Sequence, residues 1–403
     1  MLVKATNRLK FSYGANVLLV LLVFRCIVDL FEDSYITTQL SIITGGNTTK
    51  IAIYYIVKHL LCPIGALLAG RWVKTHCLTV MRIGIIADLI FFIAFSQIKD
   101  TWGSIIVIAA IQGLALVLYY LPLSFVTANW VLDKERHRFL SYQSVISKTM
   151  SIIIPVTLGT IIYATNYNST IKLMIVIVAL QLITIAVIRS DKTCESSNFD
   201  MLGFVKKSVK DKEMRDYFLI SILKGLTLIG AQSQLINMLI FNRFGNEYEL
   251  GKITSLIAIL SIISFWTFGK FGSEKIYRQI IKSFTVIQVV VVLALLAITN
   301  EITIIAIRMC FDCTLSIVRL IADNYCYKLV NKPLNKTMKS EFFVYQEFGL
   351  NIGRIISWII VIFVSLLTFV SSGTILTVSL CMITIAFVIM SVMLSRALKS
   401  STN

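Results

Sequence analysis

Residues 104–127 read SIIVIAAIQGLALVLYYLPLSFVT, a run of 24 residues without one charged side chain. An α-helix needs about 20 residues to cross a hydrocarbon core of about 30 Å, so this run predicts a membrane-spanning helix. Lys99 is the one basic residue in the segment before it, whereas Lys134, Arg136 and Arg138 lie together in the segment after it. Such an asymmetry is typical of a helix whose C-terminal end faces the cytoplasm.

The same pattern recurs along the whole chain. Twelve apolar stretches can be placed, centred near residues 25, 60, 88, 113, 153, 179, 229, 260, 288, 313, 357 and 383. Of the 38 Lys and Arg residues, 26 fall in the segments on the side of the two termini, five in the opposite segments and seven inside spans. The positive-inside rule therefore predicts that both termini are cytoplasmic.

Composition narrows the function classes. Hydrophobic residues make up 57% of the chain and charged residues 15%, which leaves no room for a large soluble domain. The net charge of +17 is explained by membrane topology and by attraction to anionic lipid headgroups, so no nucleic-acid partner is expected. The apolar run that begins at Val17 lacks a small-residue cleavage pattern, so we interpret it as a retained first span rather than a signal peptide.

Signatures of enzymes are missing from the sequence. It contains no G-x-x-x-x-G-K-[ST] for nucleotide phosphates and no H-E-x-x-H or Cys/His cluster for a metal. We therefore expect neither catalysis nor a cofactor nor a bound metal.

The longest polar segment, residues 189–216, divides the chain into two halves of six spans. Arg25 and Lys224 occupy corresponding places in the first and seventh spans, and Tyr142-Gln143 and Tyr345-Gln346 do so in the fifth and eleventh. We predict a bundle over 1–188, a cytoplasmic linker over 189–216 and a second bundle over 217–403. Internal repeats of this kind are common in secondary transporters, with the substrate site between the repeats.

With these features the chain resembles the major facilitator superfamily over nearly its whole length. The family's loop after span two reads G-x-x-x-D-R-x-G-R-R/K; here Arg71 and Lys74 match its basic positions, while Gly70 stands for the acid and Val73 for the second glycine. The glycine-proline motif of exporters is reduced to Pro155 and Gly159.

Residues 341–354, EFFVYQEFGLNIGR, look like the eleventh span of a poorly characterised bacterial branch of predicted exporters. The resemblance implies an all-α membrane protein with twelve transmembrane helices in two pseudo-symmetric six-helix bundles. It also implies a central cavity lined by spans one, four, seven and ten, in a bacterial cytoplasmic membrane.

Charged residues form a stripe on two of these spans. The first span carries Arg25, Asp29, Glu32 and Asp33, and the tenth carries Arg308, Asp312, Arg319 and Asp323. At 100° per residue each set of four falls within an arc of about 100°, so each set shares one helix face. An ionised side chain at mid-membrane costs about 2.5–3.5 kcal/mol on insertion scales, so such residues usually face a cavity or a partner and indicate function.

Two interpretations of the stripes stay open. Arg25 with Asp29, and Arg308 with Asp312, have the i to i+4 spacing at which opposite charges meet, so these pairs can serve only to hold the bundle together. The first span, however, has three acids and one arginine, so at least one carboxylate needs a proton, a partner on another helix or water. We predict Asp29, Asp33 and Asp312 as proton-coupling residues, with Asp29 first.

The remaining predicted site residues are polar side chains within spans or at their cytoplasmic ends. The predicted substrate-binding residues are Arg25, Tyr119, Tyr120, Lys224, Gln232, Gln234 and Arg308. The predicted gating residues are Arg71, Lys74, Glu347, Asn351 and Arg354. Lys224 is expected either to bind an anionic substrate group or to pair with Asp29 or Asp33. Each polar residue can instead hydrogen-bond a neighbouring helix.

The function predicted from these features is proton-coupled export of a small solute by alternating access, carried out by a monomer in the lipid bilayer. A proton-coupled uptake symporter for an anionic or zwitterionic solute is the first alternative. A lipid-linked flippase or a non-transporting membrane sensor is the second.

Overall fold

The protein is helical throughout the part that the structure, a computed structural model, describes. The described residues are 13–130, 133–187, 199–271, 276–298, 300–330, 332, 338–367 and 372–400, and among them there is no β-strand. The basic N-terminal residues 1–12, residue 188 and residues 189–198 of the predicted linker lie outside the described part.

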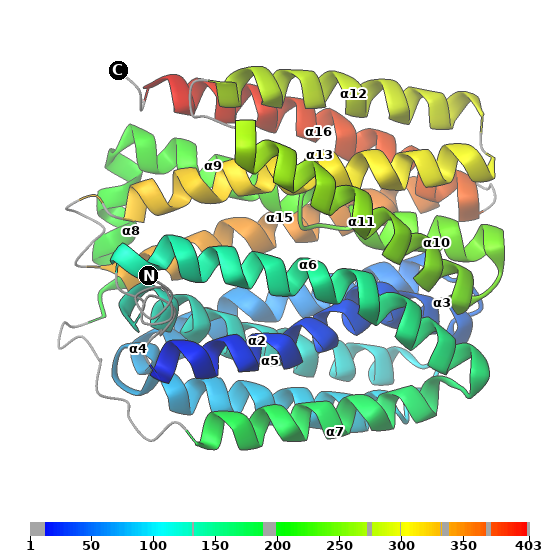
Figure 1. The fold of residues 1–403 in the computed structure, drawn as a ribbon, viewed down its shortest axis with the longest axis horizontal. Coiled ribbons are helices and arrows are strands. Elements are labelled where there is room, and N and C mark those ends of the chain that lie inside the picture. The colour runs from blue at the N-terminus through cyan, green and yellow to red at the C-terminus, as the bar shows by residue number, and fades with distance from the viewer. Residues whose placement is uncertain are drawn as a thin grey trace, which may run out of the picture.

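The helices lie side by side along the long axis of the molecule (Figure 1). Those of the first half are α2 (Tyr13–Phe31), η1 (Glu32–Ile36), α3 (Thr37–Ile43), α4 (Thr48–Phe95), α5 (Trp102–Trp130), α6 (Asp133–Ala164) and α7 (Tyr167–Ala186). After the short α8 (Met201–Lys210) come α9 (Lys212–Thr227), α10 (Gln232–Phe244), α11 (Glu247–Phe271), α12 (Tyr277–Ala297), α13 (Glu301–Val330), α15 (Lys339–Leu367) and α16 (Ser372–Ser400). Helices up to α7 fill the lower part of Figure 1, and those from α9 onward fill most of the upper part.

The helix α4 is a hairpin of two arms rather than one rod. At 1.5 Å per residue a straight helix over its 48 residues would be about 72 Å long, far more than a bilayer core. Its backbone leaves helical geometry at His76, with φ −139° and ψ 51°. Lys50 near its start lies 2.7 Å from Asp100 just beyond its end, so the arms run antiparallel. They correspond to the predicted second and third spans.

The predicted first span is interrupted by one π-helical turn, η1, which contains Glu32 and Asp33. A π-turn inserts extra backbone into the helix and shifts every following side chain around the axis. The two acids therefore do not follow the regular 100° spacing that the sequence analysis used. Glu32 is buried, whereas Asp33 is exposed.

The predicted seventh span is broken between α9 and α10. The break leaves backbone N–H groups without a helical acceptor, which is costly inside a membrane unless another group accepts the bond. The N–H of Ala231 donates to the hydroxyl of Ser357 on α15, at 3.0 Å. The neighbouring helix thus satisfies the broken backbone.

The first and second halves contact each other along two helix pairs, α4 with α15 and α6 with α11. On the α4 side, the rings of Tyr55 and Trp358 stack with centroids 4.4 Å apart and planes at 2°. On the α6 side, Pro155 cannot donate a backbone hydrogen bond, and its carbonyl accepts one from the Tyr35 hydroxyl. The next N–H, of Val156, donates to Ser255 of α11 at 3.2 Å.

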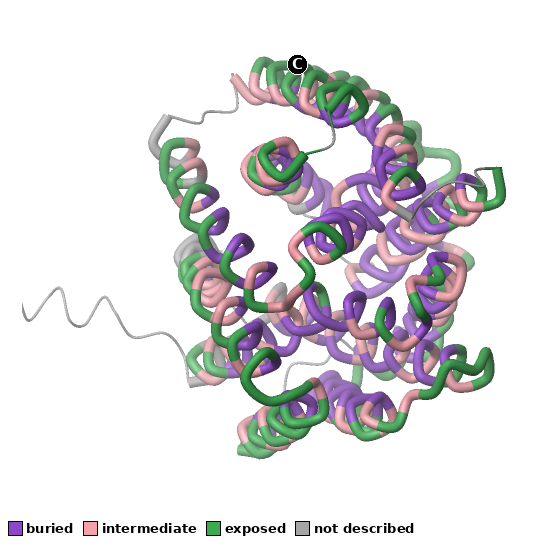
Figure 2. Tube along the Cα trace, turned by 90° about the vertical axis from the view of Figure 1, so that its right-hand side faces the viewer, coloured by how far each residue is buried: buried purple, intermediate pink, exposed green. Residues whose placement is uncertain are grey.

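The outer surface fits a lipid environment. Among the described residues, nine helices are long and apolar enough to cross a membrane, with α4 counted once. Buried residues face the interior of the bundle, and exposed ones lie on its outer side (Figure 2). Many of the exposed side chains are large and apolar, for example Leu68, Trp72 and Ile302. The count of twelve crossings and the division into two six-helix bundles stay predictions.

The helices α9 and α15 approach so closely that a side chain cannot fit between them at Gly353. A Cβ at this position would overlap the main chain of Ile222 and lie 2.6 Å from the amide nitrogen of Leu226. We expect Gly353→Val to lower the free energy of unfolding by about 2 kcal/mol or more, because overpacking forces the two backbones apart.

The measurement is the apparent melting temperature of the detergent-purified protein. Gly103→Ala is the matched control, because a Cβ at Gly103 meets nothing within 4 Å. A Gly353→Val protein that melts with the wild type would contradict this account of the packing.

Candidate functional site

The first charged stripe is centred on the guanidinium group of Arg25, which is only 1% exposed. Its Nε lies 2.8 Å from Asp29, and its Nη1 donates to Asp88 on the second arm of α4 at 2.6 Å. Glu32 lies 3.9 Å from Nη2. Burying a charge costs several kcal/mol unless it is paired and hydrogen-bonded, and here three carboxylates provide the pairing.

Two tyrosines of α5 hold Arg25 from the other side. The guanidinium carbon lies 4.8 Å from the ring centroid of Tyr119 and 5.1 Å from that of Tyr120. Both distances are within the range of cation–π attraction. The hydroxyl of Tyr120 also donates a hydrogen bond to Asp29. These predicted substrate-binding tyrosines therefore contact the charged stripe directly.

A second buried pair extends the cluster. The Lys58 ammonium lies 3.5 Å from Glu32, and the Gln112 amide donates to the same carboxylate at 2.7 Å. The Tyr54 hydroxyl in turn donates to Gln112 at 2.6 Å. Glu32 is thus held between the first arm of α4 and α5.

Sequence reasoning missed Asp88 and gave Lys58 no role. Asp88 stands alone in an otherwise apolar span, which was the available signal, because an isolated acid within a span usually has a partner. What the sequence did not reveal was that this partner is Arg25. The arms of α4 supply one member each, Lys58 and Asp88, to the cluster around α2.

The second stripe has the same form on α13. Arg308 donates to Asp312 through Nε at 2.9 Å, and its Nη1 donates to Asn237 at 2.8 Å and to Ser233 at 3.3 Å. Arg308 is buried, while the side chain of Asp312 is 30% exposed, as is that of Asp29. Each stripe therefore presents a half-exposed carboxylate backed by a buried arginine.

Asn237 of α10 joins the two stripes. While its side-chain oxygen accepts from Arg308, its side-chain nitrogen donates to the backbone carbonyl of Asp33 at 3.0 Å. The carboxylate of Asp33 is exposed and interacts electrostatically with Lys58 and Arg319. Asp33 is thus in contact, through its backbone carbonyl, with the second half of the chain.

The other predicted substrate-binding residues lie elsewhere on α9 and α10. Lys224 is buried and pairs with Asp323 of α13, not with Asp29 or Asp33. Arg319 lies 4.0 Å from the same Asp323 and is 54% exposed. Gln232 is buried, and neither of its amide atoms has a hydrogen-bond partner among the described residues. Gln234 is half-buried, with its side-chain oxygen likewise unpaired in the described part.

Comparison with known proteins identifies the family. The family model for the Major Facilitator Superfamily matches residues 34–357. The chain belongs to the Major Facilitator Superfamily. It is thus a multi-pass membrane transporter rather than an enzyme.

Solved structures of facilitator-type transporters have the same fold at low sequence identity. The nucleoside transporter NupG is 12% identical with a TM-score of 0.67, and the match covers 96% of this chain and 99% of NupG. A bacterial homologue of the iron transporter ferroportin, in an outward-facing state, is 12% identical with a TM-score of 0.68 over 95% of this chain and 98% of its own. A bacterial metal transporter is 14% identical with a TM-score of 0.60 over 96% and 99%. No curated protein sequence matches the chain.

The altered family loop contacts the eleventh span. Lys74, next to the α4 turn, is buried and lies 2.8 Å from the buried Glu341 at the start of α15. The same carboxylate accepts from the N–H of Asp200 at 3.0 Å, and Ser340 donates to the carbonyl of Gly70 at 3.0 Å. Arg71 is exposed. The loop, α8 and α15 are therefore fastened together at one end of the bundle.

The predicted gating residues of α15 form a chain within that helix. Arg354 donates to Asn351 at 3.0 Å, and Asn351 donates to the Glu347 carboxylate at 3.0 Å. Asn351 is fully buried, and Arg354 interacts electrostatically with His59 of α4. These residues thus lie at the α4–α15 interface between the halves.

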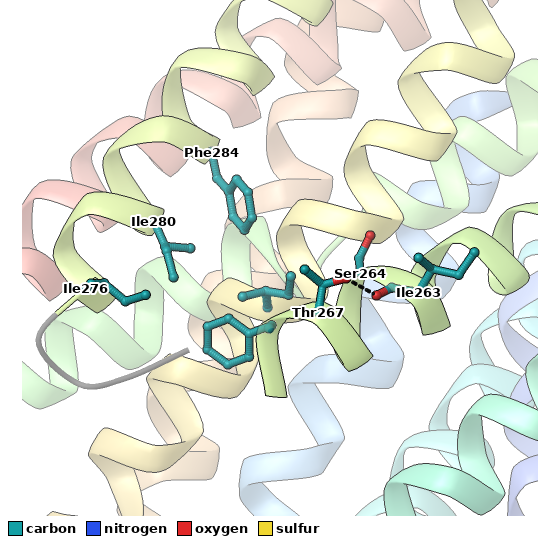
Figure 3. Close-up of a pocket in the computed structure, with 8 residues that line it drawn as sticks. Ile263, Ser264, Thr267, Ile276, Ile280 and Phe284 are labelled. Atoms are coloured by element: carbon teal, nitrogen blue, oxygen red, sulfur yellow. Dashed lines mark hydrogen bonds between the residues drawn. The ribbon is translucent and has the colours of Figure 1, made fainter. Parts of the chain in front are cut away.

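A pocket between α11, α12 and α13 has a different chemistry (Figure 3). Its lining consists of Ile263, Ser264, Thr267, Phe268, Ile276, Ile280, Phe284 and Ile317. None of these side chains is charged. The pocket therefore does not belong to the charged site.

Breaking the Lys74–Glu341 pair gives a test of its contribution. We expect Glu341→Gln to lower the free energy of unfolding by about 3 kcal/mol, because the buried ammonium loses its carboxylate. The measurement is the apparent melting temperature together with the yield of monodisperse protein. The double exchange Lys74→Glu with Glu341→Lys should restore part of the loss. An unchanged Glu341→Gln protein would show that the pair contributes nothing to stability.

Water access to the stripes can be tested by thiol labelling. In a background whose eight native cysteines are replaced by alanine, Asp33→Cys and Asp312→Cys should react with a charged, membrane-impermeant thiol reagent in proteoliposomes. Val28→Cys, fully buried close to Asp29, should remain unreactive. Equal, low reactivity at all three positions would mean that the stripes are sealed from water.

Proposed function

We propose that this transporter moves a small solute across the bacterial cytoplasmic membrane by proton-coupled antiport, in the direction of export. The proposal includes twelve crossings, bundles over 1–188 and 217–403 joined by the 189–216 linker, cytoplasmic termini, and a monomer in the lipid bilayer. The contacts across the α4–α15 and α6–α11 pairs support two halves that can rock against each other.

One observation carries the proposal. Asp29 and Asp312 are each half-exposed at mid-span, and each rests on a buried arginine. A carboxylate that water can reach can exchange a proton. Its protonation changes the electrostatic attraction to the buried guanidinium, and therefore the relative stability of the helix arrangements. Asp33, exposed in the π-turn, is a third acid that a proton can reach.

The mechanism follows from the contacts. A proton on Asp29 cancels its attraction to Arg25, which keeps Asp88 and Glu32 as counter-ions. Because Asp29 and Arg25 lie one turn apart on α2, the loss of this pair weakens the contacts within α2 just before η1. The hydrogen bond that Asn237 donates to Asp33 of η1 conveys the change to Arg308 on α13. Protonation thus biases the equilibrium between inward-open and outward-open arrangements, because it stabilises one of them more than the other.

An uptake symporter for an anionic or zwitterionic solute is the alternative, and Arg319 favours it. This guanidinium is 54% exposed and shares the carboxylate of Asp323 with Lys224. By contrast Arg25, Lys224 and Arg308, the other predicted cationic contacts, are buried. The flippase and sensor alternatives have no comparable group of residues in their favour among those that the structure describes.

The test uses proteoliposomes with an imposed pH gradient and a pH-sensitive dye inside. A panel of solutes is added, including nucleosides and iron ions, because nucleosides and iron are named for the structural neighbours. We expect Asp29→Asn to abolish gradient-driven solute movement while the protein stays folded. Asp100→Asn, which removes an exposed charge paired with Lys50, should transport as the wild type does. Unaltered coupling in Asp29→Asn would refute the assignment.

A further inference from the structure

The buried cluster in the first half contains more acids than bases. Its members in mutual contact are Arg25, Lys58, Asp29, Glu32 and Asp88. With every group ionised, two positive charges face three negative ones, which leaves one negative charge without a counter-ion. An uncompensated charge is costly in such an environment, so the cluster is balanced when one carboxyl group holds a proton.

Exposure decides which carboxyl group takes that proton. Asp88 is 1% exposed and Glu32 is 5% exposed, whereas the side chain of Asp29 is 30% exposed. Glu32 is already held by Lys58 and Gln112, and Asp88 by the 2.6 Å hydrogen bond from Arg25. Asp29 is the member that a proton can reach, and its protonation weakens only its own pairing with Arg25 while the Arg25–Asp88 and Lys58–Glu32 pairs stay in place.

We infer that Asp88 is a positioning residue for proton binding: its fixed negative charge on Arg25 leaves Asp29 without a full counter-ion, so Asp29 takes up the coupling proton. The inference rests on the proposed function, in which Asp29 is the proton site. Removing the charge of Asp88 leaves two acids and two bases in the buried cluster. Asp29 then becomes the main counter-ion of Arg25 and holds a proton only at lower pH.

Other groups act on Asp29 from the surrounding elements, and they are the same before and after the substitution. They are Tyr120 of α5 with its donated hydrogen bond, Tyr119 of α5, Glu32 and Asp33 of η1, and Cys26 of α2. Lys148 of α6 interacts with Asp312 and Arg319 on the opposite half. A difference between wild type and Asp88→Asn therefore reports the charge of Asp88.

Infrared difference spectroscopy gives a readout that needs no known substrate. Purified full-length protein in lipid nanodiscs is titrated with acid, and the C=O stretching band of protonated carboxyl groups is followed. Wild type should show a band that Asp29→Asn lacks. In Asp88→Asn the band should remain, with its midpoint about one pH unit or more lower, because a like charge has been removed from the site.

Two further variants separate charge from structure. Asp88→Glu keeps the charge, so its midpoint should stay near that of wild type. Glu32→Gln removes a negative charge from the same cluster and should also lower the midpoint. This variant tests whether the excess negative charge of the cluster sets the midpoint, even if Asp88→Asn fails to fold. Asp100→Asn, at a surface pair, should change nothing.

The outcomes distinguish the two claims. If the pH-dependent band survives Asp29→Asn unchanged, Asp29 is not the proton site and the proposed function fails. If the band needs Asp29 but its midpoint is the same in Asp88→Asn and Glu32→Gln, the inference about Asp88 alone is overturned. A band that is lost in Asp88→Asn and kept in Asp29→Asn would place the proton on Asp88 and overturn it as well.

Discussion

The first half of this transporter is organised around one buried guanidinium. Moving Arg25 out of water is costly, and the cost is offset only when several groups converge on it. Asp29 comes from α2, Glu32 from η1, Asp88 from the second arm of α4, and the tyrosine rings from α5. Because each group must stay within a few ångströms of Arg25, these four elements are held in one relative position.

The second half repeats this arrangement with weaker partners. Among the residues that the structure describes, Arg308 contacts one carboxylate, that of Asp312, and donates its other hydrogen bonds to neutral groups of α10. Neutral partners hold a guanidinium less strongly than carboxylates do. The link between the stripes is also neutral, through the amide of Asn237. The contact between the stripes is thus neutral, whereas the buried ion pair that crosses between the halves, Lys74 with Glu341, lies at one end of the bundle.

The apolar stretches and the stripes could be predicted from sequence because both depend on composition and helical spacing. The family assignment agrees with the expectation drawn from the loop and span motifs. Features that depend on contacts between different helices could not be predicted from the sequence. The partner of Lys224 is Asp323 rather than a first-span acid, because the long side chain of Lys224 reaches α13 in the same half. The π-turn at Glu32 and the pairing of Asp88 with Arg25 likewise could not be predicted, because neither produces a periodic pattern of residues in the sequence.

The hairpin α4 turns at His76 without an intervening loop, so the positions of its two arms relative to each other are fixed by a single non-helical residue. Lys58 on one arm and Asp88 on the other contact the charged stripe of the first span. Lys74, which lies next to the turn, forms an ion pair with Glu341 of the second half. The turn of the hairpin is therefore bound to the second half of the chain, whereas both of its arms contact the charged residues of the first half. The two arms of α4 therefore connect Glu341 of α15, at one end of the bundle, with the ion cluster around Arg25.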